Sequence, residues 1–241
     1  MVNSIILKSR VHDKVKAMRT WAFVSQKGGV GKSSLATNLA VVAEKSGETC
    51  CIVDVDPQAN ALLWAERRGT NAPMVLEATY EKLADVVAAA ATIGVTLTII
   101  DTPGKVDAGA LAAMKIADTI VCPTLGDLFS LGSLDDTVRL LKAADRLSAA
   151  IAVINNVDKS GAKQTIAEAT AVLKSYGISI ATTPIMHHPH FAKAISRGKS
   201  VTETAPTSGA AEEVSALWAV LNKGATAKPK RRTVKTGRAT L

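Results

Sequence analysis

The sequence predicts a single α/β domain built on a mostly parallel, twisted sheet with helices on both faces. Short runs rich in β-branched residues alternate with longer segments rich in alanine and leucine, which is the pattern of repeated strand–helix units. Apolar residues make up 47% of the 241 residues and aromatic residues only 3%, so Ala, Val, Ile and Leu must form the core. A chain of this length buries one substantial core, which favours one domain.

Six strands are expected, each an apolar run that ends at polar or turn-forming residues, at 20–25, 49–55, 96–101, 119–123, 150–155 and 178–184. Eight helices are expected between and after them, at 32–46, 58–67, 80–91, 108–117, 131–147, 161–176, 190–197 and 210–221. In the last of these, apolar residues recur at helical spacing, which predicts a helix that docks on the core: Val214, Leu217, Trp218 and Leu221.

The net charge of +8 lies at the two ends of the chain. Residues 1–19 carry +4, residues 223–241 carry +7, and the residues between them carry −3. We therefore expect a basic N-terminal extension at 1–18, the folded domain at 19–222 and a basic, disordered tail at 223–241. Such ends raise the local concentration of polyanions, so nucleic acid or an anionic membrane surface becomes a candidate partner, although a purely solubilising role is comparable for the tail.

The three cysteines form neither a disulfide framework nor a C-x-x-C metal pair, which fits a reducing cytosol. The run 86–100 is the longest weakly polar stretch, but Gly94 and threonines interrupt it. We therefore expect no membrane span and a cytoplasmic protein.

A glycine-rich loop stands between the first expected strand and the first expected helix. Glycines let backbone N–H groups converge on phosphate oxygens, and the following helix N-terminus adds positive potential. Lys32 would reach the β- and γ-phosphates of ATP, and the Ser33 hydroxyl would complete a Mg²⁺ site. The predicted nucleotide-binding residues are Gly28, Gly29, Val30, Gly31, Lys32, Ser33 and Ser34.

The run from Lys27 to Ser33 resembles the deviant Walker A motif of the ParA/MinD superfamily, in the small ParA type that lacks an N-terminal DNA-binding domain. The resemblance extends from about residue 20 to residue 221. It implies an ATP-dependent homodimer in which the additional lysine, Lys27, reaches the phosphates of the partner subunit. A second lysine there would offset the charge that develops as the phosphoryl group leaves.

Three acids lie at or next to the ends of expected strands. Asp54 and Asp56 end the strand at 49–55, where a parallel sheet presents its ligand crevice. The resemblance to ParA proteins implies that Asp56 positions or activates the attacking water, while Asp54 supports the metal and the loop. Asp101 ends an apolar strand in the manner of a Walker B segment, whose carboxylate holds Mg²⁺ directly or through water. Gly104 follows where many ParA proteins have a second proline.

Further candidate site residues lie in the C-terminal half of the chain. Asn155 matches the adenine-contacting asparagine of the family, although a strand-end turn explains it equally well. The family binds DNA without sequence preference through basic residues of its C-terminal region, where Lys193, Arg197 and Lys199 cluster. The resemblance also implies a ParB-like or other adaptor that stimulates hydrolysis, and a nucleoid-associated location. The tail residues Lys228, Lys230, Arg231 and Arg232 would add a phosphate-binding arm or only solubility.

Three other functions and a metal site are alternatives for this sequence. A MinD-like, membrane-associated positioning ATPase would need a terminal amphipathic helix, and the basic tail has too few large apolar residues for one. A metabolic P-loop synthetase stays open, and a saturable small substrate would identify it. A scaffold without hydrolysis is disfavoured by Asp56. Metal binding by His187, His188 and His190 is disfavoured because no acid or cysteine lies at ligand spacing.

Overall fold

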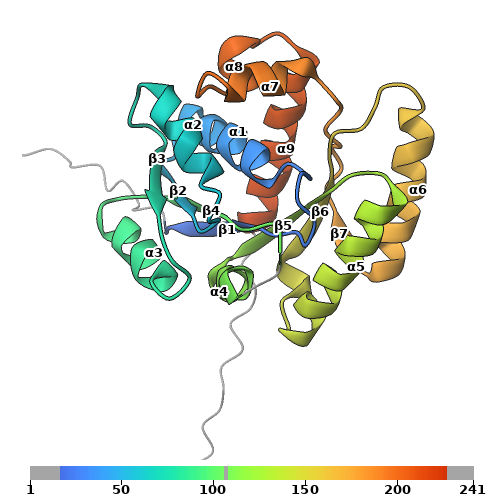
Figure 1. The fold of residues 1–241 in the computed structure, drawn as a ribbon, viewed down its shortest axis with the longest axis horizontal. Coiled ribbons are helices and arrows are strands. Elements are labelled where there is room, and N and C mark those ends of the chain that lie inside the picture. The colour runs from blue at the N-terminus through green and yellow to red at the C-terminus, as the bar shows by residue number, and fades with distance from the viewer. Residues whose placement is uncertain (1–16, 106–107, 227–241) are drawn as a thin grey trace, which may run out of the picture.

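The structure is a computed structural model that describes residues 17–105 and 108–226. Within these residues a seven-stranded sheet has the order β3-β2-β4-β1-β5-β6-β7, and every neighbouring pair of strands is parallel (Figure 1). This confirms the predicted α/β class. The strands are β1 (Arg19–Phe23), β2 (Cys50–Asp54), β3 (Met74–Glu77), β4 (Leu97–Asp101), β5 (Thr119–Thr124), β6 (Ala150–Ile154) and β7 (Ser179–Ile180).

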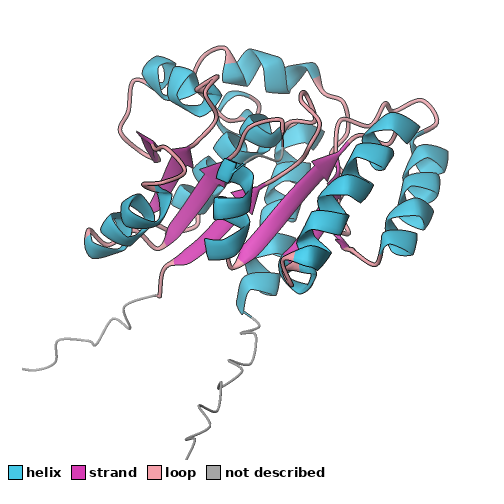
Figure 2. Ribbon diagram, turned by 60° about the horizontal axis from the view of Figure 1, so that its bottom comes forward, coloured by secondary structure: helices cyan, strands magenta, loops and turns pink. Residues whose placement is uncertain are grey.

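Helices cover both faces of the sheet (Figure 2). Consecutive strand residues point to opposite faces, so Trp21 and Phe23 pack in one core and Ala22 in the other. The first face is covered by α1 (Lys32–Lys45), α2 (Asn60–Arg68), α7 (Pro189–Ile195), α8 (Val201–Thr204) and α9 (Gly209–Thr226). The second is covered by α3 (Leu83–Thr92), α4 (Ala108–Ile116), α5 (Leu128–Ala143) and α6 (Ala162–Tyr176), and the short helix η1 (Leu147–Ala149) precedes β6.

Two edge strands differ from the prediction. Strand β3 was not predicted, because it has only four residues and is partly exposed at the sheet edge. Strand β7 has two residues instead of the seven expected, because only Ser179 and Ile180 pair with β6. Helix α9 continues to Thr226, beyond the expected end at residue 221. Residues 1–16 of the predicted extension and 227–241 of the predicted tail lie outside the described residues.

Because all strands are parallel, the loops that follow them gather at one edge of the sheet, which we call the carboxyl edge; the opposite edge is the amino edge. The glycine-rich loop follows β1 at the centre of the sheet, with β4 and β5 on either side. In the part of the chain that the structure describes, no helix combines the length and the apolar character needed to cross a bilayer.

Candidate functional site

The glycine-rich loop leads from β1 directly into α1. Gly29 (φ 77°) and Gly31 (φ 94°) adopt left-handed backbone conformations that side-chain-bearing residues rarely take. Gly31 is the N-cap of α1, and no side chain caps the helix there. The first N–H groups of α1 are therefore available to an anion, and the helix dipole adds positive potential at the same place. The loop has the properties of a phosphate cradle.

Asn155 braces this loop from the end of β6. Its side chain is 7% exposed and donates a hydrogen bond of 2.7 Å from Nδ2 to the carbonyl oxygen of Val30. A Cβ atom at Gly31 would lie 2.3 Å from that Nδ2 and would displace it, and the φ of 94° is also unfavourable for any residue but glycine. The structure thus shows Asn155 holding the phosphate loop, a role that the sequence did not predict. Contact with adenine stays a prediction.

Lys32 lies at the start of α1 with 7% of its surface exposed. Burial lowers the pKa of its ammonium group, while the nearby carboxylates of Asp101 and Asp56 raise it. Acids from the ends of β2 and β4 therefore face the lysine of the loop. The structure brings together the three residues that the sequence assigned to phosphate binding, to hydrolysis and to the metal.

Asp101, at the end of β4, is the most unusual acid of the group. It is 0% exposed, and neither carboxylate oxygen has a hydrogen-bond partner. Burial raises its pKa to about 7; Asp54 adds to this rise, whereas Lys32 and the nearby Ser33 hydroxyl oppose it. Buried orphaned oxygens are costly unless a ligand satisfies them. A carboxylate beside a serine hydroxyl offers the hard oxygen ligands that Mg²⁺ prefers, so these residues fit a magnesium ion.

Asp54 and Asp56 have different surroundings. Both oxygens of Asp54 accept backbone N–H groups, from Asp56 at 3.0 Å and from Ala61 and Leu62 at 2.9 and 3.3 Å. Asp54 therefore ties the loop after β2 to the start of α2, and its predicted support of a metal stays a prediction. The half-buried Asp56 accepts an N–H of that loop on Oδ1 at 3.0 Å, which fixes its side chain near Lys32.

Lys27, the additional lysine of the loop, contacts α5 of its own chain. Its Nζ donates to Ser130 Oγ at 2.7 Å and lies 3.5 Å from Asp127 Oδ1. Asp127 is the N-cap of α5 and accepts the Ser130 N–H at 3.0 Å. Burial acts to raise the pKa of Asp127, but the hydrogen bonds from Ser130 and the Lys27 ammonium outweigh it, so this pKa lies below its ordinary value. The sequence gave no sign of this contact, because the residues are 103 positions apart.

The loop after β4 also touches the phosphate loop. The Thr102 hydroxyl donates to the carbonyl oxygen of Phe23 at 2.6 Å, which anchors this loop to β1. Two residues later, a Cβ atom at Gly104 would lie 3.1 Å from Gly28 Cα, a tight approach to backbone. Glycine at 104, where many ParA proteins have proline, thus lets the two loops lie close together.

The predicted DNA-contacting residues lie in and just after α7. Lys193 and Arg197 are exposed and Lys199 is partly exposed. Gly198, between the last two, lies so close to the end of α2 that a Cβ atom there would be 2.5 Å from the Arg67 carbonyl carbon. The exposed Arg67 therefore lies close to these basic residues in the fold. The sequence missed it because it lies about 130 positions before its neighbours.

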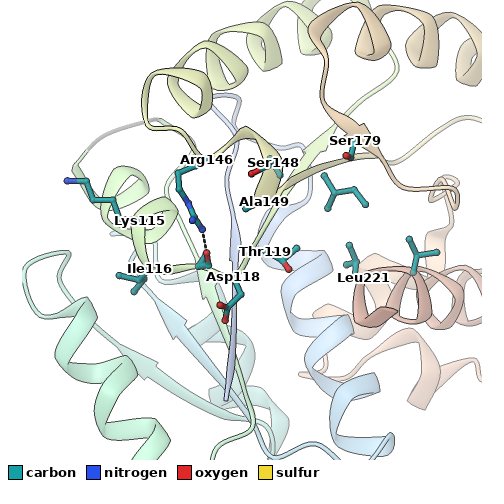
Figure 3. Close-up of a pocket in the computed structure, with 13 residues that line it drawn as sticks. Lys115, Ile116, Asp118, Thr119, Arg146, Ser148, Ala149, Ser179 and Leu221 are labelled. Carbon is teal, nitrogen blue, oxygen red and sulfur yellow. Dashed lines mark hydrogen bonds between the residues drawn. The ribbon is translucent and has the colours of Figure 1, made fainter. Parts of the chain in front are cut away.

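Two other features lie away from the phosphate loop. A hollow of about 510 Å³ opens at the amino edge, beside Arg146 (Figure 3). Arg146 donates hydrogen bonds to the carbonyl oxygens of Met114, at 3.0 Å, and Ala117. Its position at the far edge of the sheet separates it from the nucleotide site. Of the histidines, His188 pairs with Glu213 at 3.1 Å and His187 with Asn156 at 2.9 Å.

Comparisons with known proteins agree with this geometry. Residues 21–201 match the protein-family model for the CobQ/CobB/MinD/ParA nucleotide binding domain. The chain is 38% identical over 131 residues to Maintenance of carboxysome distribution protein A of Gloeobacter kilaueensis, and the match covers 50% of this chain and only 55% of that relative. It is 28% identical over 227 residues to the chromosome-partitioning ATPase Soj of Thermus thermophilus, covering 79% of this chain and 90% of Soj. Its fold is similar to the septum site-determining protein MinD of Pyrococcus horikoshii complexed with Mg-ADP, with a TM-score of 0.70, 20% identity and coverage of 88% and 99%.

Proposed function

We propose that this chain, which belongs to the CobQ/CobB/MinD/ParA nucleotide-binding family and is an ATPase of the ParA type, uses ATP to form a homodimer that binds DNA without sequence preference and positions a cargo. The observation that carries the proposal is the convergence of Lys32, Asp56 and Asp101 at the glycine-rich loop, with both Asp101 oxygens buried and unpartnered.

Each residue of this group has a task in ATP hydrolysis. The amides of residues 28–33 and the start of α1 bind the phosphates, and Lys32 supplies positive charge to the γ-phosphate. Ser33 and Asp101 would hold Mg²⁺, which neutralises charge on the phosphates when bound. Asp56 orients the attacking water and accepts its proton.

Dimerisation rests on Lys27. The ParA-type loop places this lysine beside the phosphate cradle, but here its ammonium contacts α5 of the same chain. We propose that in the ATP-bound dimer Lys27 leaves α5 and reaches the phosphates of the second subunit. Hydrolysis would then remove the charge that holds Lys27 there, and so would release the dimer.

The basic face formed by Lys193, Arg197, Lys199 and Arg67 is the proposed DNA surface. Four cations on one face would bind phosphates by displacing counterions, which gives affinity without sequence preference and a steep dependence on salt. A dimer presents two such faces, so the bound lifetime on DNA would rise with ATP. The protein would accordingly be nucleoid-associated.

The cargo and the stimulating partner are proposed by analogy. The relatives named above distribute carboxysomes or partition chromosomes, according to their names. We propose that an adaptor protein, ParB-like or of another kind, links this ATPase to its cargo and stimulates hydrolysis.

Hydrolysis is tested with two variants and a matched carboxylate control. We expect Lys32→Ala to abolish ATP binding, and Asp56→Ala to keep ATP-dependent dimerisation while losing hydrolysis. Asp136→Ala, at an exposed position of α5, is the control and keeps both. Radiolabelled ATP turnover and sizing with ATP decide between the outcomes. Undiminished turnover in Asp56→Ala would remove Asp56 from the mechanism.

DNA binding is tested by charge reversal on one face at a time. We expect the double variant Lys193→Glu, Arg197→Glu to lose ATP-dependent binding to DNA of unrelated sequences. The control, Lys163→Glu with Lys174→Glu, makes the same change of charge at exposed positions of α6, on the other face of the sheet. Equal loss in both double variants would show that only net charge matters, and no loss in either would refute the proposed face.

A further inference from the structure

The first turn of α5 exposes two large apolar side chains. Leu128 is 77% exposed and Phe129 is 81% exposed, the highest fractions among the large hydrophobic residues that the structure describes. Neighbouring residues of a helix point about 100° apart, so both side chains lie on the solvent side of the first turn of α5, whereas Ser130 and Leu131 are buried. Adjacent exposed apolar side chains of this size favour a contact that removes them from water.

The apolar pair stands in the sequence between the two residues that contact Lys27. These two residues are Asp127 and Ser130, and both contact the Lys27 ammonium. Strand β5 ends at Thr124, so the pair also lies at the carboxyl edge, beside the phosphate loop. A partner that receives Lys27 must therefore approach this part of the surface.

We propose that Leu128 and Phe129 form part of the interface between two copies of this chain in its ATP-bound dimer. The inference rests on the proposed function, because it presumes that Lys27 crosses to a second subunit. In a two-fold dimer the same surface of each copy meets the other. The surface next to Lys27 is then covered in both copies, so Leu128 and Phe129 of each copy are buried in the dimer.

The charges around the pair favour a second copy as its occupant. In the proposed dimer the positively charged Lys27 of each copy is drawn to the phosphates bound by the other copy, so the surfaces around Lys27 face each other across the two-fold axis. The Asp127 carboxylate, in contrast, repels the phosphates of DNA and of anionic lipid. The proposal therefore assigns the pair to a protein contact with the same chain.

The first test measures dimerisation of variants in the hydrolysis-deficient Asp56→Ala background. We expect Leu128→Ser combined with Phe129→Ser to weaken ATP-dependent dimerisation at least about tenfold, since four apolar side chains stay in water for each dimer. ATP binding by the monomer stays unchanged. Ile93→Ser is the control: this residue is 62% exposed, but it stands between α3 and the start of β4, at the amino edge.

The outcomes of this test are distinct. If Asp56→Ala itself stays monomeric with ATP, the proposed dimer fails, and the interface fails with it. If Asp56→Ala dimerises and the Leu128, Phe129 double variant dimerises equally well, the dimer stands and only the interface is overturned. Equal weakening of dimerisation by Ile93→Ser also overturns the proposed interface, because the loss would then not depend on where the exposed apolar side chain lies.

The second test places a probe at position 129. The three native cysteines are all buried, and burial raises the pKa of Cys51 to about 11 and that of Cys122 to about 12, so they react slowly with thiol reagents. Phe129→Cys therefore adds one accessible thiol for an environment-sensitive fluorophore. With ATP we expect a blue shift that grows with protein concentration, and none for the same dye at Ile93→Cys.

Protein concentration separates burial between copies from a change within one copy. A shift that ATP produces equally at all protein concentrations would contradict the proposal. So would a shift that appears only when anionic vesicles or DNA are added, because the pair would then belong to a different contact.

Discussion

Replacing Asp101 by asparagine tests the electrostatics of the site most directly. In the folded protein, burial raises the pKa of this carboxyl to about 7, whereas its ordinary value is 3.8. Between these two pH values the folded state binds more protons than the unfolded chain. The contribution of Asp101 to stability is therefore complete below pH 3.8 and is lost as the pH rises to about 7. Asparagine has a similar shape and does not titrate.

The size of the effect follows from the shift. One pKa unit corresponds to about 1.4 kcal/mol. Above the folded-state pKa of about 7 the extra proton is lost, so only about two of the pH units between 5 and 8 change the stability. The full value is near 2.7 kcal/mol, and relaxation of the buried site reduces it. We expect the free energy of unfolding of the wild-type protein to fall, relative to Asp101→Asn, by about 1–3 kcal/mol between pH 5 and pH 8.

The measurement is urea denaturation without Mg²⁺ or nucleotide at both pH values, for the wild-type protein and the variant. Asp136→Asn, at an exposed position of α5, is the control and should follow the wild-type protein. Adding Mg²⁺ with ADP should stabilise the wild-type protein more than Asp101→Asn, since the variant lacks the carboxylate that fits the metal. An identical pH dependence for wild type and Asp101→Asn would refute the assigned pKa.

Three further predictions concern the contacts of the phosphate loop. Asp127→Asn keeps the cap of α5 but removes the negative charge that holds Lys27 on α5. Exposed ion pairs contribute at most about 1 kcal/mol, so the affinity of ATP-dependent dimerisation, measured by sizing, should rise up to about fivefold. A lower dimer affinity would contradict this. Gly104→Ala should lower ATP affinity severalfold in equilibrium binding, because its Cβ would press on the backbone of the phosphate loop. The control Gly132→Ala, whose Cβ would have nothing within 4 Å, should keep the affinity. Equal affinities of the two variants would show that the two loops can move apart without affecting ATP binding. Asn155→Ala removes one buried hydrogen bond, so it should lower the free energy of unfolding by about 1–2 kcal/mol in urea and weaken nucleotide binding; an unchanged value would remove its bracing role.

The sequence was sufficient for the centre of the fold and for the residues of the phosphate loop. Central parallel strands are apolar on both faces and end in polar residues at the ligand edge, so the hydrophobic pattern placed Asp54 and Asp101 at strand ends, and the order of the motifs along the chain supported that placement. The edge strands lacked this signal. Strand β3 is short and partly exposed, and only two residues of β7 pair with their neighbour.

Contacts between distant loops could not be predicted in the same way. The bond from Asn155 to the carbonyl of Val30 joins residues 125 positions apart, and no local pattern distinguishes it from a turn asparagine. The position of Arg67 beside the end of α7 depends on the close approach at Gly198, which the packing of α2 decides. Such pairings follow from the order of the strands in the sheet, which the hydrophobic pattern of one sequence does not specify.

These contacts connect the phosphate loop to the surface that we assign to the dimer, so ATP bound at the loop would affect dimerisation. Loops after three different strands touch the phosphate loop: Asn155 after β6, Gly104 after β4 and Ser130 beyond β5. Two of these contacts involve the backbone of the loop, and the third holds the side chain of Lys27. In the proposed dimer, the γ-phosphate bound by the second copy would attract Lys27 away from the neutral hydroxyl of Ser130, and the exposed ion pair with Asp127 is too weak to oppose this strongly. Lys27 then leaves α5 and extends toward the second copy, so the charge of the nucleotide and the formation of the proposed interface would be coupled through one side chain.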